Sequence, residues 1–113
     1  MTSPTVPTPS SEALALAPAT RRDFAVLVPA YNEAPVIPDL VRELRRAFDE
    51  YGLTGEVILV DDGSTDDTAA VAERETRGWE GFRVVRHRAN RGKTEAMVTA
   101  AEATDRTYLV LFD

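Results

Sequence analysis

The sequence contains no cysteine and a single histidine, His87. Disulfide bonds and thiolate metal sites are therefore excluded, and a histidine without a visible partner is expected at the surface, at the end of a strand. No apolar run approaches the roughly 20 residues that a membrane-spanning helix requires. Positive charge is scarce too, because 13 Lys and Arg stand against 19 Asp and Glu, a formal net charge of −6. This balance argues against a general binder of nucleic acid or anionic membranes, since both need a basic surface.

The 113 residues can form at most one domain, with 43% hydrophobic and 28% charged residues, as in ordinary globular chains. Residues 1–22 hold four of the seven prolines among Ser, Thr and Ala, a composition that predicts a disordered tail. Residues 23–113 are expected to fold. The chain stops one residue after the apolar segment Leu109–Phe112, which we expect to be a buried strand. This indicates a fragment of a longer protein.

Apolar segments alternate with helical patterns along residues 23–113. The expected strands are 24–28, 57–60, 82–87 and 107–112, and the expected helices are 37–51, a short one after Asp67, and 93–104. Charges in the third strand favour an edge position, and Trp79 is expected to be a hydrophobic lid. Strands that alternate with helices predict a parallel sheet with right-handed crossovers. The expected fold class is therefore α/β, a Rossmann-like β-α-β-α-β-α-β sheet with strand order 3-2-1-4.

The second expected strand runs directly into Asp61, Asp62 and Gly63. Ser64 and Asp67 then have the spacing of a helix capping box, and Asp66 and Asp67 suit the positive end of a helix dipole. A calcium loop is excluded, because Gly63 is misplaced for one and no Glu stands at the twelfth position. The segment therefore predicts a strand, an acidic turn and a helix.

In a parallel sheet the carboxyl ends of all strands lie along one edge, where α/β folds bind ligands. This edge gathers polar residues from 31–33, 61–64 and 88–93, together with Asp113. Arg91 and Lys93 lie near a predicted helix N-terminus, which we expect to be an anion site. A mixed rim of this kind fits a ligand that carries both hydrogen-bond donors and phosphates. A divalent cation would allow Asp113 to face phosphate oxygens.

Residues 28–33 (VPAYNE), 60–66 (VDDGSTD), 90–93 (NRGK) and 111–113 (LFD) resemble, in order and spacing, the amino half of family 2 glycosyltransferases. These are inverting enzymes of the GT-A fold and include polyprenyl-phosphate sugar transferases. The resemblance extends from about residue 23 to residue 113. One departure is 104–106 (TDR), at a turn where the family often has glycine.

The resemblance implies a site for a nucleotide-sugar donor. Its residues would be Pro29, Ala30, Tyr31, Glu33, Asp61, Asp62, Arg91 and Lys93. Asp113 would be the first aspartate of an Asp-x-Asp motif that binds Mg²⁺ or Mn²⁺ through the donor diphosphate. The second aspartate, the acceptor half and the general base would lie beyond the chain, so these residues alone are expected to bind nucleotide weakly and to catalyse nothing. The acceptor stays open between a polyprenyl phosphate, a saccharide and another class. We expect a cytoplasmic protein, and attachment to the inner face of the membrane through segments outside this chain stays open.

Two other functions stay open from the residues themselves. In a signalling receiver domain, Asp61, Asp62 and Asp113 would form an acidic phospho-acceptor pocket, although residues 23–51 have no place in that scheme. A purely regulatory binder of nucleotide sugars would need the same pocket without catalysis. A dinucleotide-binding module is excluded, because the first turn lacks Gly-x-Gly-x-x-Gly.

Overall fold

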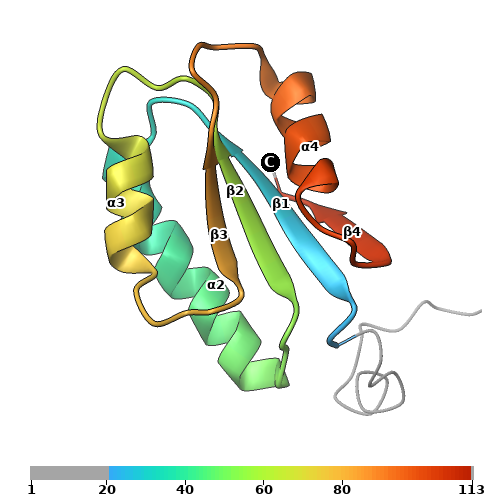
Figure 1. Ribbon diagram of the computed structural model, residues 1–113. Coiled ribbons are helices and arrows are strands. Elements are labelled where there is room, and N and C mark those ends of the chain that lie inside the picture. Colours follow the sequence, from blue (N-terminus) through green and yellow to red (C-terminus); the bar gives the residue numbers. More distant parts are fainter. Residues whose placement is uncertain (1–20, 113) are drawn as a thin grey trace, which may run out of the picture.

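The computed structural model describes residues 21–112 of the chain (Figure 1). The strands are β1 (Phe24–Ala30), β2 (Glu56–Asp61), β3 (Phe82–Arg86) and β4 (Tyr108–Leu111). The helices are α2 (Ile37–Tyr51), α3 (Thr68–Glu75) and α4 (Lys93–Glu102), with a short 3₁₀ helix η1 (Ala34–Val36) before α2. The tail expected over 1–22 lies, except for Arg21 and Arg22, outside the described residues, as does Asp113.

The four strands form one parallel sheet in the order β3-β2-β1-β4, which confirms the predicted order and the α/β class. Helices α2 and α3 cover one face of the sheet, and α4 covers the other (Figure 1). The chain therefore builds outward from β1 to β3, then returns across the sheet to place β4 on the far side of β1. Every strand points its carboxyl end toward the same edge.

Alternation along the two central strands divides the core in two. Val26 and Leu59 pack on the side of α2 and α3, whereas Leu27 and Val60 pack on the side of α4. Helix α4 meets the sheet through Ala96 and Ala100, among other residues, and both are buried. Small side chains at these positions bring the helix backbone close to the sheet, which keeps the loop before α4 near the ends of β1 and β2.

Helix α2 has the bounds that the sequence predicts, residues 37–51. Its buried face is Ile37, Val41, Leu44 and Phe48. The helix ends at Gly52, whose φ of 63° is the left-handed conformation expected for a glycine cap. Trp79 packs between the rings of Phe48 and Phe82, 5.2 Å from each, and Arg45 lies 4.8 Å from the Trp79 ring. The hydrophobic lid predicted for Trp79 is thus confirmed, at the end of the sheet opposite the carboxyl edge.

The prediction that the fourth strand is buried is wrong. All four residues of β4 are exposed, from 44% for Leu109 to 65% for Leu111. β4 is an edge strand that pairs with β1 alone, and the described helices lie over its neighbours.

Among residues 21–112, no helix has both the length and the apolar character that a membrane span requires.

Candidate functional site

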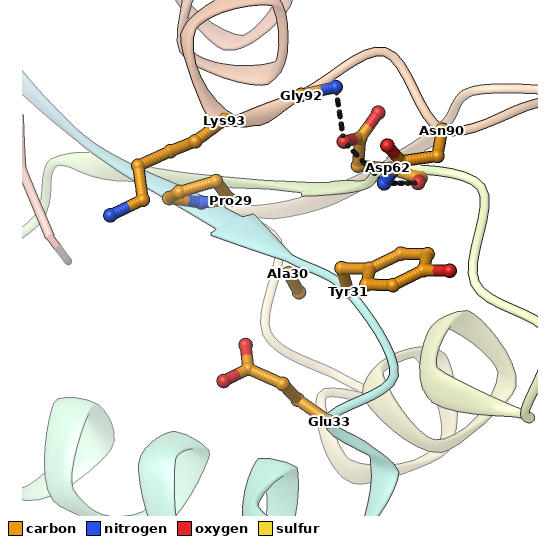
Figure 2. A pocket seen from close by; sticks show the side chains of 8 residues that line it. All are labelled: Pro29, Ala30, Tyr31, Glu33, Asp62, Asn90, Gly92 and Lys93. Carbon is orange, nitrogen blue, oxygen red and sulfur yellow. Dashed lines mark hydrogen bonds between the residues drawn. The ribbon is translucent and has the colours of Figure 1, made fainter.

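A pocket of about 400 Å³ lies at the carboxyl edge of the sheet, a volume within the range of small-molecule sites. It is lined by Pro29, Ala30, Tyr31, Glu33, Asp62, Asn90, Gly92 and Lys93. Figure 2 shows the side chains of Lys93 and Glu33 on opposite sides of the pocket, with Pro29 and Ala30 between them. The pocket therefore brings an ammonium group and a carboxylate to the two sides of one cavity.

The structure brings most of the predicted site residues together. Six of the eight line the pocket, and the described lining does not include Asp61 or Arg91. Asn90 and Gly92 were missed as lining residues, although both belong to the NRGK run that flagged Arg91 and Lys93. Asp113 lies outside the described residues. That these side chains bind nucleotide stays a prediction.

The loop after β1 forms the first wall and is fastened to the loop after β2 by Asn32. The Asn32 N–H donates to Ser64 Oγ at 2.8 Å, and Asn32 Oδ1 accepts from the Thr65 N–H at 2.8 Å and the Asp66 N–H at 3.3 Å. Asn32 has a φ of 52°, a conformation that asparagine tolerates better than most residues. The Glu33 N–H donates to Thr68 Oγ1 at 2.9 Å. These bonds fix the direction in which Tyr31 and Glu33 leave the sheet.

The turn after β2 is closed by Asp61, which is buried and whose Oδ1 accepts from the Ser64 N–H at 3.0 Å. Gly63 has a φ of 72°, and a Cβ there would lie 2.3 Å from the backbone carbon of Ala89. Only glycine therefore allows the loop after β3 to lie against this turn. The prediction that Ser64 begins a capping box is wrong, because α3 starts later, at Thr68, and its N-cap Asp67 makes no side-chain cap.

Asp66 instead turns the chain into α3. Its Oδ1 accepts from the hydroxyl of Thr68 and from the Thr68 N–H at 3.0 Å, and its Oδ2 accepts from the Ala34 N–H at 3.3 Å. The hydrogen bonds from Thr68, ahead of any other cause, hold the pKa of Asp66 below its usual range. Asp66 is thus an ionised link between the first two loops.

Asp62 forms the second wall together with the loop after β3. Its Oδ1 accepts from His87 Nδ1 and from the Arg91 N–H, both at 2.8 Å. Its Oδ2 accepts from Asn90 Nδ2 at 3.0 Å and from the Gly92 N–H at 2.8 Å (Figure 2). A carboxylate has about four lone-pair positions, so the acceptor capacity of Asp62 is filled by the protein itself.

Two opposing effects act on the pKa of the buried Asp62. Burial raises it, but the hydrogen bonds from His87 and from the Arg91 and Gly92 amides together outweigh burial and lower the pKa below its ordinary value. The group is therefore ionised at neutral pH. Because its carboxylate already occupies the amides of Arg91 and Gly92, these two donors are not open to a phosphate. An anion site at the start of α4, as predicted, would therefore have to do without these two amides.

The prediction that His87 is a surface residue is wrong. Its side chain is only 5% exposed, with Nδ1 against Asp62 and Nε2 2.7 Å from Thr99 Oγ1. No sequence pattern revealed these partners, because they lie 25 and 12 residues away and on other elements. His87 joins the end of β3 to the end of β2 and to α4.

The strand order argues against the receiver scheme. That scheme starts at β2 and needs its first and third strands, here β2 and β4, to be neighbours in the sheet. In this sheet β1 lies between them. In addition, all four acceptor positions of Asp62 are engaged in holding a loop, which leaves none for a metal in an acidic pocket.

Among residues 21–112, no group of three or more His, Asp or Glu side chains could hold a metal ion together. Asp113 follows Phe112, whose N–H donates to the Leu27 carbonyl at 2.9 Å. The end of the described chain is thus tied to β1. Any metal bound beside Asp113 would take its other ligands from a substrate or from residues that the structure does not describe.

Comparison with known proteins gives matches in sequence and in structure. Undecaprenyl-phosphate 4-deoxy-4-formamido-L-arabinose transferases of Sodalis glossinidius and Salmonella paratyphi B are 43% and 40% identical over 47 and 48 residues. These segments are 42% of this chain but only 14% and 15% of the relatives. The chain therefore matches a small part of each relative's length.

Two solved structures share the fold. Glucosyl-3-phosphoglycerate synthase from Mycobacterium tuberculosis, in complex with Mn²⁺, UDP and glucosyl-3-phosphoglycerate, is similar over 98% of this chain and 39% of its own, with 30% identity and a TM-score of 0.73. A mannosyltransferase from Pyrobaculum calidifontis, in complex with GDP-Man and Mn²⁺, is similar over 73% of this chain and 24% of its own, with 30% identity and a TM-score of 0.63. The parallel sheet with the order 3-2-1-4 therefore matches glycosyltransferases of the GT-A fold, as the resemblance implied.

The family comparison extends over nearly all of the described residues. The model of the family described as "Glycosyl transferase family 2" matches residues 25–113, from β1 to the end of the chain. On this match, the chain belongs to glycosyl transferase family 2.

Proposed function

We propose that the full-length protein transfers a sugar from a nucleoside diphosphate donor to an acceptor, and that the pocket at the carboxyl edge holds the nucleotide of the donor. The observation that carries the proposal is that one cavity, in a sheet with the strand order of the family, is lined by Lys93 and by Pro29, Ala30, Tyr31 and Glu33. The solved neighbours, one with GDP-Man and one with UDP, support a nucleotide ligand.

Each side of the pocket has a distinct role in this proposal. Pro29 and Ala30 form its floor, and the half-exposed ring of Tyr31 offers a surface for a base or a ribose. The carboxylate of Glu33 accepts hydrogen bonds from ribose hydroxyls or base N–H groups, and the ammonium of Lys93 approaches the diphosphate. Asp62 acts by holding the wall at Asn90 and Gly92, because its own acceptors are filled. Asp61 closes the turn beneath, and the exposed Arg91 lies at the rim.

The metal belongs to the same proposal. Mg²⁺ or Mn²⁺ beside Asp113 would supply Lewis-acid stabilisation of the departing diphosphate. Both solved neighbours contain Mn²⁺. Among residues 21–112, no group of three or more His, Asp or Glu side chains completes such a site.

The chemistry we propose is direct displacement. The acceptor oxygen forms a bond to the anomeric carbon while the bond to the diphosphate breaks, and a carboxylate takes the acceptor proton. This reaction inverts the anomeric centre. The general base and the acceptor site would come from the remainder of a longer chain. The small share of each neighbour that this chain covers supports that expectation, as do the exposed apolar residues of β4.

The acceptor is proposed as a class. The matched relatives are named for undecaprenyl phosphate, and this supports a polyprenyl phosphate acceptor. The solved neighbour named for glucosyl-3-phosphoglycerate supports a small phosphorylated acceptor instead. Transfer assays of the full-length protein with a polyprenyl phosphate and with phosphoglycerate would separate the two.

Calorimetric titration of the full-length protein with UDP and GDP, with Mn²⁺ and then with EDTA, tests the donor site. We expect one of the two nucleotides to bind with Mn²⁺ and to bind weakly or not at all in EDTA. Lys93→Ala should weaken binding about tenfold, or about 1.4 kcal/mol. The matched control is Arg77→Ala, an exposed cation before β3, which should bind as wild type. Equal affinities of the two variants would refute the site. Binding without transfer to any acceptor would instead indicate a regulatory binder.

A further inference from the structure

A polar triad beside the pocket joins the loops after β2 and β3 to α4. The side chains of His87 and Asp62 are 5% and 4% exposed. His87 Nδ1 lies 2.8 Å from Asp62 Oδ1, and His87 Nε2 lies 2.7 Å from Thr99 Oγ1 on α4. An imidazole held at both nitrogens in a nearly dry environment has a fixed ring orientation, because rotation would leave buried polar atoms without partners.

The charge state of Asp62 fixes the direction of one hydrogen bond. Hydrogen bonds from His87 and the loop amides lower the pKa of Asp62, so its carboxylate accepts only. His87 Nδ1 must therefore carry a proton and donate it. Nε2 of a neutral ring then accepts from the Thr99 hydroxyl, and a charged ring would donate to it. In either state His87 is the side-chain donor that approaches Asp62 from the side of β3.

Asp62 transmits this orientation to the pocket. The oxygen that accepts from His87 also accepts from the Arg91 N–H, and the other oxygen holds Asn90 and Gly92. Asn90 and Gly92 line the cavity, whereas His87 is not in its described lining. A rotation of the carboxylate would misalign all these bonds at once. The effect of His87 therefore reaches the wall without any contact with the ligand.

We propose that His87 is a positioning residue of the donor pocket: it orients the Asp62 carboxylate and thereby holds the Asn90–Gly92 wall in its binding shape. The link to donor affinity rests on the proposed function, but the ordering of the loop does not. If the role of His87 were purely structural, loss of its contact with Thr99 and loss of its contact with Asp62 would have the same effect on the loop. A positioning role makes the Asp62 contact the decisive one.

Two amide variants separate the contacts of the ring. The amide nitrogen of an Asn side chain can lie where His87 Nδ1 lies, so His87→Asn keeps a donor for Asp62 and loses the hydrogen bond with Thr99. The longer Gln places its amide near Nε2, so His87→Gln keeps a partner for Thr99 and withdraws the donor from Asp62. Thr99→Val is the matched control, since it removes the hydroxyl and leaves the ring beside Asp62. All three should lower global stability, because each leaves buried polar atoms without a partner.

Hydrogen exchange of the full-length protein, without ligand, measures the wall directly. We expect His87→Gln to speed exchange at the Arg91 and Gly92 amides roughly tenfold or more relative to wild type, since the loss of a hydrogen bond to a charged group permits local opening. His87→Asn and Thr99→Val should stay near wild type at these amides. The β2 amide of Leu59 should stay protected in every variant, which shows that the fold is intact.

Donor titration and kinetics complete the test. His87→Gln should raise the KM for the donor roughly tenfold with kcat near wild type, as expected for lost uniform binding, and His87→Asn should restore most of the affinity. Equal exchange at Arg91 and Gly92 in His87→Gln and Thr99→Val would overturn the inference, as would failure of His87→Asn to restore protection. If wild type binds no nucleotide, the proposed function fails, while the exchange comparison still decides the role of His87 in the loop.

Discussion

Asp62→Asn changes the shape of a buried side chain very little, yet we expect it to be almost as harmful as Asp62→Ala. Each carboxylate oxygen accepts two hydrogen bonds, one pair from His87 and the Arg91 amide and the other from Asn90 and the Gly92 amide. If the amide nitrogen lies toward Asn90 and Gly92, two donors face another donor. If it lies toward His87 and Arg91, the Arg91 amide does, because a neutral His87 can take the other tautomer and accept at Nδ1. The isosteric variant therefore cannot keep the network.

The magnitude follows from these bonds. Hydrogen bonds to a charged acceptor are each worth about 1.5–3 kcal/mol, so the loss of one or two gives about 1.5–6 kcal/mol. Arg91 is exposed and Gly92 is partly buried, so their amides can recover water when the loop opens. We therefore expect both variants to lower the free energy of unfolding by about 2–4 kcal/mol.

Urea denaturation of wild type and variants measures this loss, with m-values compared to confirm that the same unfolding is observed. The matched control is Asp67→Asn, the same chemical change at an exposed position that makes no side-chain cap. It should stay within about 0.5 kcal/mol of wild type. An Asp62→Asn protein as stable as Asp67→Asn would refute the reasoning that both oxygens of Asp62 are filled.

Three further predictions follow from the same loops. Gly63→Ala should lower the free energy of unfolding by about 2–5 kcal/mol, because the residue has a positive φ and lies against the backbone of Ala89. The control Gly78→Ala, which also has a positive φ but open space around it, should lower it by about 1–2 kcal/mol. Equal shifts of the two variants in thermal unfolding would contradict this. Asn32→Ala should lower the free energy of unfolding by about 1–3 kcal/mol and weaken donor binding, because the backbone amides of Thr65 and Asp66 lose their acceptor. An unchanged donor affinity would count against a role of Asn32 in shaping the pocket. The pKa of Asp62 is lowered from the ordinary 3.8, so its contribution to the free energy of unfolding is present above about pH 4 and is lost as the pH falls through the folded pKa. The difference in stability between wild type and Asp62→Ala should therefore narrow in acid. A difference that stays constant down to the acid transition would argue against an ionised, hydrogen-bonded Asp62.

The strand order and the place of the pocket could be predicted from the sequence because they depend on local signals. The alternation of strands and helices predicts a parallel sheet, and the polar residues after each strand predict where a ligand binds. Strand-end position located Asp61 and Asp62 correctly at the edge. The sequence did not show which carboxylate oxygens can still accept a hydrogen bond, because the donors to Asp62 come from residues some 25–30 positions away.

The errors have a common physical cause. The apolar run of β4 predicts a strand, but its burial depends on what lies over it, and the described helices cover other strands. His87 had no partner within reach in the sequence, and the fold supplies two through tertiary contact. Ser64 matched a capping pattern, but its hydroxyl oxygen accepts from the backbone N–H of Asn32, and the helix begins at Thr68. Local patterns thus locate elements, and tertiary contacts decide which polar atoms remain available.

Hydrogen exchange of the full-length protein with and without UDP or GDP and Mn²⁺ is the most direct test of the proposed nucleotide pocket. The structure offers a built-in comparison, because a second cavity, around Trp79 and Gly55, lies at the opposite end of the sheet. We predict that nucleotide protects residues 29–33 and 90–93 and leaves residues 53–55 and 78–81 unchanged. Protection confined to the opposite end, or no protection at 29–33 and 90–93 under saturating nucleotide, would contradict the assignment of the donor site to the carboxyl edge.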